Sequence, residues 1–264
     1  RDLVRSRGLG DVYKRQASGR RSASKLLVSL RGGGGHARHE LLLALGAEVA
    51  RRVGRLAGRA DEGLARCAPA DQGLLLRHPD QRVVRVLVLG GTQFIGVHIV
   101  RELLKQGYEV TLLNRGVTPS PFEGDPRVRT IRADRFEDRD AVSEAIASEA
   151  WSGVVDTTCY DVVDASTVVD AIASLETPPR GVFISTDSVF AACERVDKKA
   201  LVEADAKRAT SRQAIAELKR RDSYQYGYGS AKLDAEEVYA TIDSVSLRLP
   251  DVIGPRDNLG GFLD

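Results

Sequence analysis

Three tyrosines and one lysine lie close together near the carboxyl end of the sequence, in SYQYGYGSAK at residues 223–232. Of these tyrosines only Tyr228 is followed four residues later by a lysine, Lys232. Side chains four residues apart share one face of a helix, so the ammonium can lie near the phenol and favour its ionised form. Free tyrosine titrates near pH ~10, too high for a general base at neutrality. The pair therefore predicts acid/base catalysis, with an ordinary helix face as the alternative.

A second candidate for chemistry is the glycine-rich stretch GGTQFIG, which follows an apolar run and opens an amphipathic one. This context predicts a phosphate-binding loop between a strand and a helix, with a plain strand-to-helix turn as the alternative. Gly90 would permit the tight turn, Gly91 the approach of a pyrophosphate to the backbone, and Gly96 close packing of the helix on the strand. Amides at the helix start would hold the phosphates. The residues expected to bind the cofactor here are Gly90, Gly91, Thr92, Gln93, Phe94, Ile95 and Gly96.

The end of the second predicted strand bears on the type of cofactor. A dehydrogenase that prefers NAD places Asp or Glu there against the ribose hydroxyls, whereas this strand ends in Asn114 and Arg115. A guanidinium can pair with a 2′-phosphate, which a carboxylate would repel. We therefore favour NADP over NAD, with a solvated loop arginine as the alternative for Arg115.

The elements that must position these residues alternate along the chain from about residue 82 onward. Apolar runs predict strands, and apolar residues at helical spacing predict the helices between them. Because strand and helix alternate, the connections must cross over and the sheet must be mostly parallel, which is a doubly wound α/β fold. The predicted strands are 83–89, 109–114, 128–133, 153–158, 181–186 and 244–249; the predicted helices are 94–107, 137–150, 164–175 and 223–240.

Composition excludes several classes of protein. No apolar run approaches the roughly 18 to 20 residues that a membrane span needs, so no membrane partner is expected. The three cysteines have no C-x-x-C spacing, which excludes a disulfide scaffold and a cysteine zinc site, and we assign no metal ligand. So few cysteines fit a reducing compartment, and we expect the cytoplasm.

The amino-terminal part of the chain differs in character from the rest. Residues 1–80 carry sixteen Lys and Arg against eight Asp and Glu, and residues 6–16 resemble a translated sequencing adapter. We expect residues 1–81 to be a basic low-complexity segment, disordered or artefactual, with one helical stretch at 39–65. The folded domain is expected at 82–264. A genuine basic arm would instead be an RNA-binding tail or an organelle transit peptide.

Four motifs together give a specific resemblance: GGTQFIG after the first strand, ISTDSVF after the fifth, YGSAKLDAE in the next helix, and RLPDVIGP after the sixth strand. Residues 82–264 resemble an extended short-chain dehydrogenase/reductase of the NAD-dependent epimerase/dehydratase family. The resemblance implies a Rossmann domain in which Tyr228 is the acid/base and Lys232 its partner, both of them also contacting the cofactor, and Thr186, beside Ser185, orients the substrate oxygen. It places Asp134 against the adenine ring, with a solvated loop carboxylate as the alternative.

The resemblance also implies a function. We expect hydride transfer between NAD(P) and a hydroxyl or carbonyl of a small molecule such as a nucleotide sugar, as in an epimerase, a dehydratase or a reductase. The family builds its substrate lobe largely from chain beyond GPRDN, so we expect the sequence, which ends at Asp264, to lack most of that lobe. Gln93 replaces a glycine of the usual pattern, as in an atypical subgroup with GGTxFIG. The alternative is therefore a non-catalytic NAD(P)- or RNA-binding protein; a homodimer is compatible with both.

Overall fold

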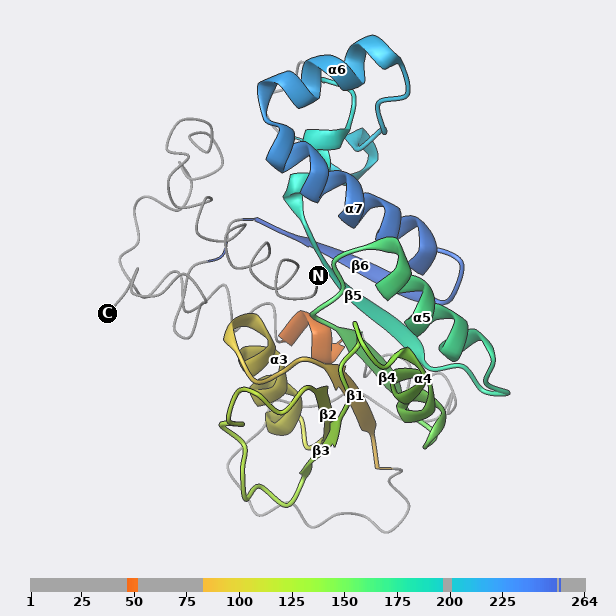
Figure 1. Ribbon diagram of the computed structural model, residues 1–264. Helices are drawn as coiled ribbons and strands as arrows, with labels where there is room; N and C mark the ends of the chain where they lie inside the picture. The colour runs from red at the N-terminus through yellow and green to blue at the C-terminus, as the bar shows by residue number, and fades with distance from the viewer. Residues whose placement is uncertain (1–46, 52–82, 197–200, 251, 253–264) are drawn as a thin grey trace, which may run out of the picture.

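The computed structural model describes residues 47–51, 83–196, 201–250 and 252. In these residues six parallel strands form one sheet in the order β3-β2-β1-β4-β5-β6 (Figure 1). All six predicted strands are present, and the sheet is parallel throughout. The strands are β1 (Arg85–Leu89), β2 (Glu109–Asn114), β3 (Val128–Arg132), β4 (Gly153–Asp156), β5 (Arg180–Thr186) and β6 (Ser244–Leu249).

Helices cover both faces of the sheet, as the doubly wound prediction requires. In Figure 1, α4, α5 and α7 lie over one face and α3 over the other. The short helices η2 and η3 and the helix α6 were not predicted; α6 is polar overall and none of its residues is buried. The helices are α3 (Phe94–Lys105), α4 (Arg139–Ala147), α5 (Val162–Ala173), η2 (Asp187–Ala192), η3 (Glu203–Asp205), α6 (Arg212–Arg221) and α7 (Ser223–Tyr239).

Alternate side chains of the central strand β1 pack into two separate hydrophobic cores. Leu87 and Leu89 pack with residues of α4, α5 and α7, whereas Val86 and Val88 pack with residues of α3. Strand side chains alternate between faces, so a strand buried on both sides must be apolar at nearly every position. This explains why β1 reads as a continuous apolar run.

The strand order reverses between β1 and β4. The chain runs outward from β1 to β3 on one side, and then from β4 to β6 on the other. Connections leave the carboxyl ends of these two neighbours in opposite directions, which opens a crevice at that edge. The topology therefore places the ligand-binding position of the fold beyond β1 and β4.

A short helical segment at residues 47–51 packs in the hydrophobic core on the α3 side of the sheet. Val49 and Ala50 are buried there, in the same cluster as the apolar residues of α3. These five residues confirm part of the helix predicted at 39–65. The adapter-like stretch 6–16, the remainder of that helix and residues 253–264 lie outside the described residues, and the domain boundary at 82 stays a prediction. Among the described residues, no helix is both long and apolar enough to cross a membrane.

We predict that Val49→Ser lowers the free energy of unfolding by about 2 kcal/mol, because it removes buried apolar surface and buries a hydroxyl. Urea denaturation of the full chain measures the change. Arg51→Ser is the matched control, since the Arg51 side chain is 63% exposed and should change stability little. Equal stability of the two variants would show that this segment contributes nothing to the core.

Candidate active site

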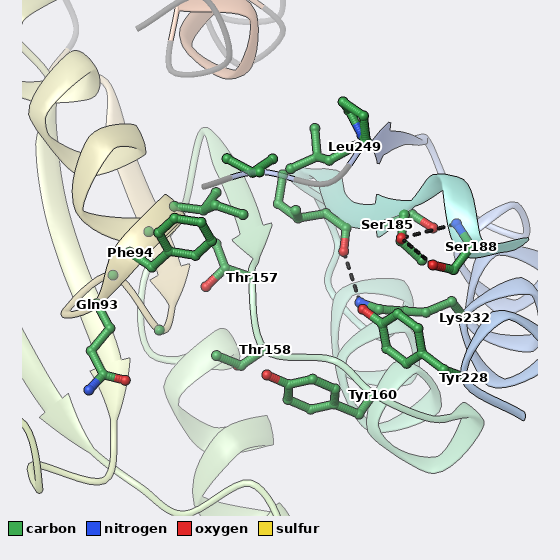
Figure 2. Close-up of a pocket in the computed structure, with 18 of the residues that line it drawn as sticks. Gln93, Phe94, Thr157, Thr158, Tyr160, Ser185, Ser188, Tyr228, Lys232 and Leu249 are labelled. Atoms are coloured by element: carbon green, nitrogen blue, oxygen red, sulfur yellow. Dashed lines mark hydrogen bonds between the residues drawn. The ribbon is translucent and has the colours of Figure 1, made fainter. Parts of the chain in front are cut away.

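One pocket lies at the carboxyl edge of the sheet, where the topology predicts it (Figure 2). It brings together the glycine-rich loop after β1, the end of β5 and the middle of α7. Thr186, Tyr228 and Lys232, predicted from widely separated motifs, all line it. The lining residues are Gly90, Gly91, Thr92, Gln93, Phe94, Ile95, Gly96, Thr157, Thr158, Tyr160, Ile184, Ser185, Thr186, Ser188, Tyr228, Lys232, Leu249, Pro250 and Val252.

The glycines of the β1–α3 loop are required by the backbone. Gly90 and Gly91 have φ values of +102° and +92°, a region that other residues rarely adopt. A Cβ on Gly96 would lie 2.7 Å from the Gly91 amide nitrogen, so only glycine lets α3 begin directly against the loop. Gly96 was predicted to ease packing of the helix on the strand; its closest neighbour is instead the loop backbone at Gly91.

The start of α3 is suited to an anion. Gln93 is the N-cap residue, its side chain makes no capping hydrogen bond, and the first turn contains no acidic residue. The first amides of a helix have no partner within the helix, and its dipole is positive at this end. Gln93 is extended, with φ −135° and ψ 153°, so this position does not require glycine. In Figure 2 the Gln93 side chain points away from Tyr228 and Lys232.

Gly229 sets the distance between α7 and the end of β5. A Cβ at this position would overlap the carbonyl oxygen of Ser188, the second residue of η2. The backbones of the two elements are therefore in direct contact, and this contact brings the neighbouring Tyr228 to the turn after Thr186. Sequence analysis missed Gly229, although a glycine inside a helix destabilises it by about 1 kcal/mol and so indicates a packing role.

Adjacent hydroxyls at the end of β5 have different environments. Ser185 donates a hydrogen bond to Glu236 Oε1 at 2.6 Å and is 4% exposed, so its hydroxyl is committed to α7. Thr186 Oγ1 accepts from the Ser188 amide at 3.1 Å, caps η2, donates to Ser188 Oγ at 3.2 Å and lines the same pocket as Tyr228. Of the two residues, Thr186 is the more exposed.

Lys232 is buried and bridges the loop after β4 and strand β5. Its ammonium donates to the carbonyl oxygens of Cys159 at 2.8 Å and Ile184 at 3.0 Å. The same nitrogen lies 4.7 Å from the centre of the Phe183 ring and 5.5 Å from that of Tyr160. Burial lowers the pKa of Lys232, and the Asp156 carboxylate acts against this shift.

The three residues predicted to contact the adenosine end of the cofactor lie at or just after the ends of β2 and β3 and do not line this pocket. Asn114 Oδ1 accepts from the Gly116 amide at 2.8 Å, while its Nδ2 is buried with no hydrogen-bond partner. Arg115 is exposed. Asp134 Oδ1 accepts from the Phe136 amide at 3.0 Å, which gives this carboxylate a structural contact at the turn after β3.

Pocket residues that sequence analysis did not assign a role come from three places: the segment after β4, the end of β5 with the turn after it, and the end of β6 with the residues after it. Thr157, Thr158 and Tyr160 line the wall between the glycine-rich loop and α7 (Figure 2). Their position at the carboxyl end of a central strand was the available signal. No group of three or more His, Cys, Asp or Glu side chains in the described part of the chain could hold a metal ion.

Comparison with known proteins identifies the family. Residues 86–263 match the sequence model of the NAD dependent epimerase/dehydratase family. The chain belongs to this family. A solved structure with a similar fold is the Bordetella bronchiseptica enzyme WbmH in complex with NAD+: its TM-score is 0.52 at 20% identity, covering 67% of this chain and 58% of that chain.

Curated relatives that match part of this chain differ in activity. The chain is 36% identical over 99 residues to a 2'-dehydrokanamycin reductase from Streptomyces kanamyceticus, over 37% of this chain and 27% of the relative. It is 35% identical over 83 residues to a UDP-glucose 4-epimerase from Lactobacillus helveticus, which covers 31% of this chain and 25% of the relative. It is 30% identical over 132 residues to an Arabidopsis thaliana chloroplast stem-loop binding protein of 41 kDa, which covers 44% of this chain and 34% of the relative. The matches thus span about a quarter to a third of these relatives.

We predict that Gly229→Ala displaces the start of α7 and weakens ligand binding in the pocket, because the new methyl group must push the helix away from Ser188. Gly227→Ala is the matched control: it lies in the same helix with nothing within 4 Å of its added Cβ, and should stabilise the protein by up to about 1 kcal/mol. Thermal unfolding and NADPH titration compare the two. Equal behaviour of both variants would contradict the proposed backbone contact.

Proposed function

We propose that this protein binds NADP and uses it to oxidise or reduce a hydroxyl or carbonyl group of a small polar substrate. One observation carries the proposal: a single pocket joins the glycine-rich loop, with its open helix start, to Thr186, Tyr228 and Lys232. Membership of the NAD-dependent epimerase/dehydratase family supports it.

The glycine-rich loop and α3 would hold the pyrophosphate, because tightly packed glycines and unpartnered amides form a cradle for an anion. Arg115, exposed after β2, would pair with the 2′-phosphate, and Asp134 would face the adenine. When bound, the nicotinamide supplies or accepts a hydride.

The protein's own groups would handle the proton and the substrate oxygen. Tyr228 takes the proton when the substrate hydroxyl is oxidised and returns it in the reverse direction. The Thr186 hydroxyl holds the reacting oxygen, and the Lys232 ammonium stabilises the ionised phenol. Lys232 can do this from a fixed position, because two carbonyl oxygens hold it.

For the substrate, we propose a sugar-like molecule, with nucleotide sugars as the first class to test. A UDP-glucose 4-epimerase and a 2'-dehydrokanamycin reductase are among the relatives, and each name describes chemistry at a hydroxyl or carbonyl group. Either kind of reaction could use the acid/base and hydride steps proposed here.

We predict that the full chain binds NADPH and that Arg115→Glu weakens binding of NADPH more than binding of NADH. The reason is that a carboxylate repels the 2′-phosphate, and NADH has no phosphate at this position. NADPH fluorescence titration measures both affinities. Arg132→Glu, at the end of the neighbouring strand β3, tests whether any charge reversal at this edge has the same effect. An equal loss for both cofactors in Arg115→Glu would argue against NADP selection.

We predict that Tyr228→Phe lowers turnover on the order of 10²- to 10⁴-fold while NADPH affinity changes little, because it removes only the proton-transferring hydroxyl. Turnover is followed with UDP-glucose first and then with a panel of sugar substrates. Tyr226→Phe is the matched control, since Tyr226 lies in the same helix against Lys219 and outside the pocket. Unchanged turnover in Tyr228→Phe would remove the assigned role.

The second candidate function is binding of RNA without turnover. It is favoured by the similarity to the stem-loop binding protein and by Gln93 in place of a glycine. Contacts to phosphates make such binding steeply dependent on salt. A gel-shift titration of a stem-loop RNA at increasing salt, alongside the NADPH titration, separates the two: NADPH binding without an RNA shift supports the enzyme, and the reverse supports the RNA-binding protein.

A further inference from the structure

A buried ion pair lies next to the pocket, outside the residues assigned so far. Arg135 follows β3 and Asp156 ends β4, and their side chains are 7% and 1% exposed. The two terminal nitrogens of Arg135 each donate to one carboxylate oxygen of Asp156, at 2.7 and 3.0 Å. Removing two charges from water consumes most of the attraction between them, so a pair like this contributes little net stability. Its contacts indicate another role.

The pair holds the first residues of the β4–α5 loop. Arg135 donates to Thr158 Oγ1 at 2.9 Å, and Asp156 Oδ1 accepts from the Thr158 amide at 3.0 Å. Arg135 also donates to the carbonyl oxygen of Asp164 at 3.1 Å. The Asp164 carboxylate in turn accepts from the amide of Tyr160 at 3.1 Å. These hydrogen bonds thus fix both Thr158 and Tyr160, the residues on either side of Cys159.

The opposite side of this loop faces α7. The carbonyl of Cys159 accepts from the Lys232 ammonium, and the Tyr160 ring lies beside the same nitrogen. Tyr239, two turns further along α7, donates its hydroxyl to Asp156 Oδ2 at 2.8 Å. The loop is therefore the layer between the ion pair and the lysine, and any movement of the loop would move the acceptor of Lys232.

We propose that Arg135 is a positioning residue: paired with Asp156, it locks residues 157–160 so that the Cys159 carbonyl holds Lys232 and the Tyr160 ring forms a fixed wall of the pocket. The consequence for the cofactor rests on the function proposed above, whereas the locking of the loop does not. The bidentate guanidinium is essential, because a lysine offers a single point charge and cannot hold Asp156, Thr158 and Asp164 at once.

Cys159 provides a direct readout of loop locking. It is fully buried, and burial raises the pKa of its thiol, so the locked loop should resist thiol reagents. We predict that Arg135→Lys in the full chain speeds labelling of Cys159 by N-ethylmaleimide about tenfold or more, a factor equivalent to 1.4 kcal/mol in the opening equilibrium. Peptide mass spectrometry assigns the label to each cysteine.

Cys193 is the internal reference, since it is also buried but belongs to the η2 region. Faster labelling of Cys159 alone supports the proposal. No change, or an equal increase at Cys193, overturns it, because the latter would reflect loss of stability throughout the domain.

Arg127→Lys is the matched control. Arg127 also makes a bidentate contact, with Asp125, and donates to a backbone carbonyl, but at the opposite edge of the sheet. It should leave Cys159 labelling unchanged. If Arg135→Lys does not fold, Tyr239→Phe decides: it removes only the hydroxyl bond to Asp156 and keeps the ring stacked on Phe183. Unchanged labelling in that variant overturns the proposal.

NADPH titration of the same variants tests the link to the cofactor. We expect weaker binding in Arg135→Lys than in Arg127→Lys, since Lys232 and the pocket wall lose their fixed positions. Wild-type affinity in an unlocked variant would refute that link. Failure of the wild-type protein to bind NADPH would contradict the proposed function, while the labelling result would still decide whether Arg135 locks the loop.

Discussion

The ammonium of Lys232 joins three parts of the structure at one point. A buried amine must satisfy its donors within the protein, and Lys232 does so with carbonyl oxygens from the loop after β4 and from β5. The Ile184 carbonyl belongs to strand β5, and the Cys159 carbonyl follows three residues after the end of β4. The lysine therefore fixes the position of α7 relative to the sheet. It thereby also fixes the position of Tyr228, which lies one turn earlier in the helix.

This contact is one of four that hold α7 along a single face. Gly229 meets the Ser188 backbone, Lys232 meets the two carbonyls, Glu236 accepts from Ser185 and from Arg248, and Tyr239 donates to Asp156. The spacing of three, four and three residues keeps all four groups on one side of the helix. Because each has a different partner, rotation or sliding of α7 would break several contacts together. A precise position for Tyr228 follows from packing and hydrogen bonding far beyond the pocket.

Sequence alone was sufficient for the parts of this structure that depend on local pattern. The β1 strand, the glycine-rich loop and the helical spacing of Tyr228 and Lys232 could all be predicted. Each depends on residues that are neighbours in the sequence: a run of apolar residues, a group of glycines, and two residues one helical turn apart. The acceptors of Lys232 could not be predicted, since a backbone carbonyl has no sequence signature. The pair of Arg135 and Asp156 was also beyond reach: the residues are 21 positions apart and meet only because of how the strands and loops are arranged. The helix α6 was missed because it is mostly exposed and polar.

The segment from Asp156 to Tyr160 connects the two halves of the proposed site. Thr157 donates its hydroxyl to the carbonyl of Leu89 at 2.7 Å, and its side chain lies where a Cβ on Gly90 would be, so it rests against the glycine-rich loop. Two residues later, Cys159 holds Lys232. One short stretch of backbone thus contacts both the glycine-rich loop and Lys232, at the two ends of the proposed site. Gln93 does not disturb this arrangement, because its backbone is extended and its side chain points away from α7. The backbone at position 93 does not require glycine, whereas the backbone at Gly90, beside Thr157, does.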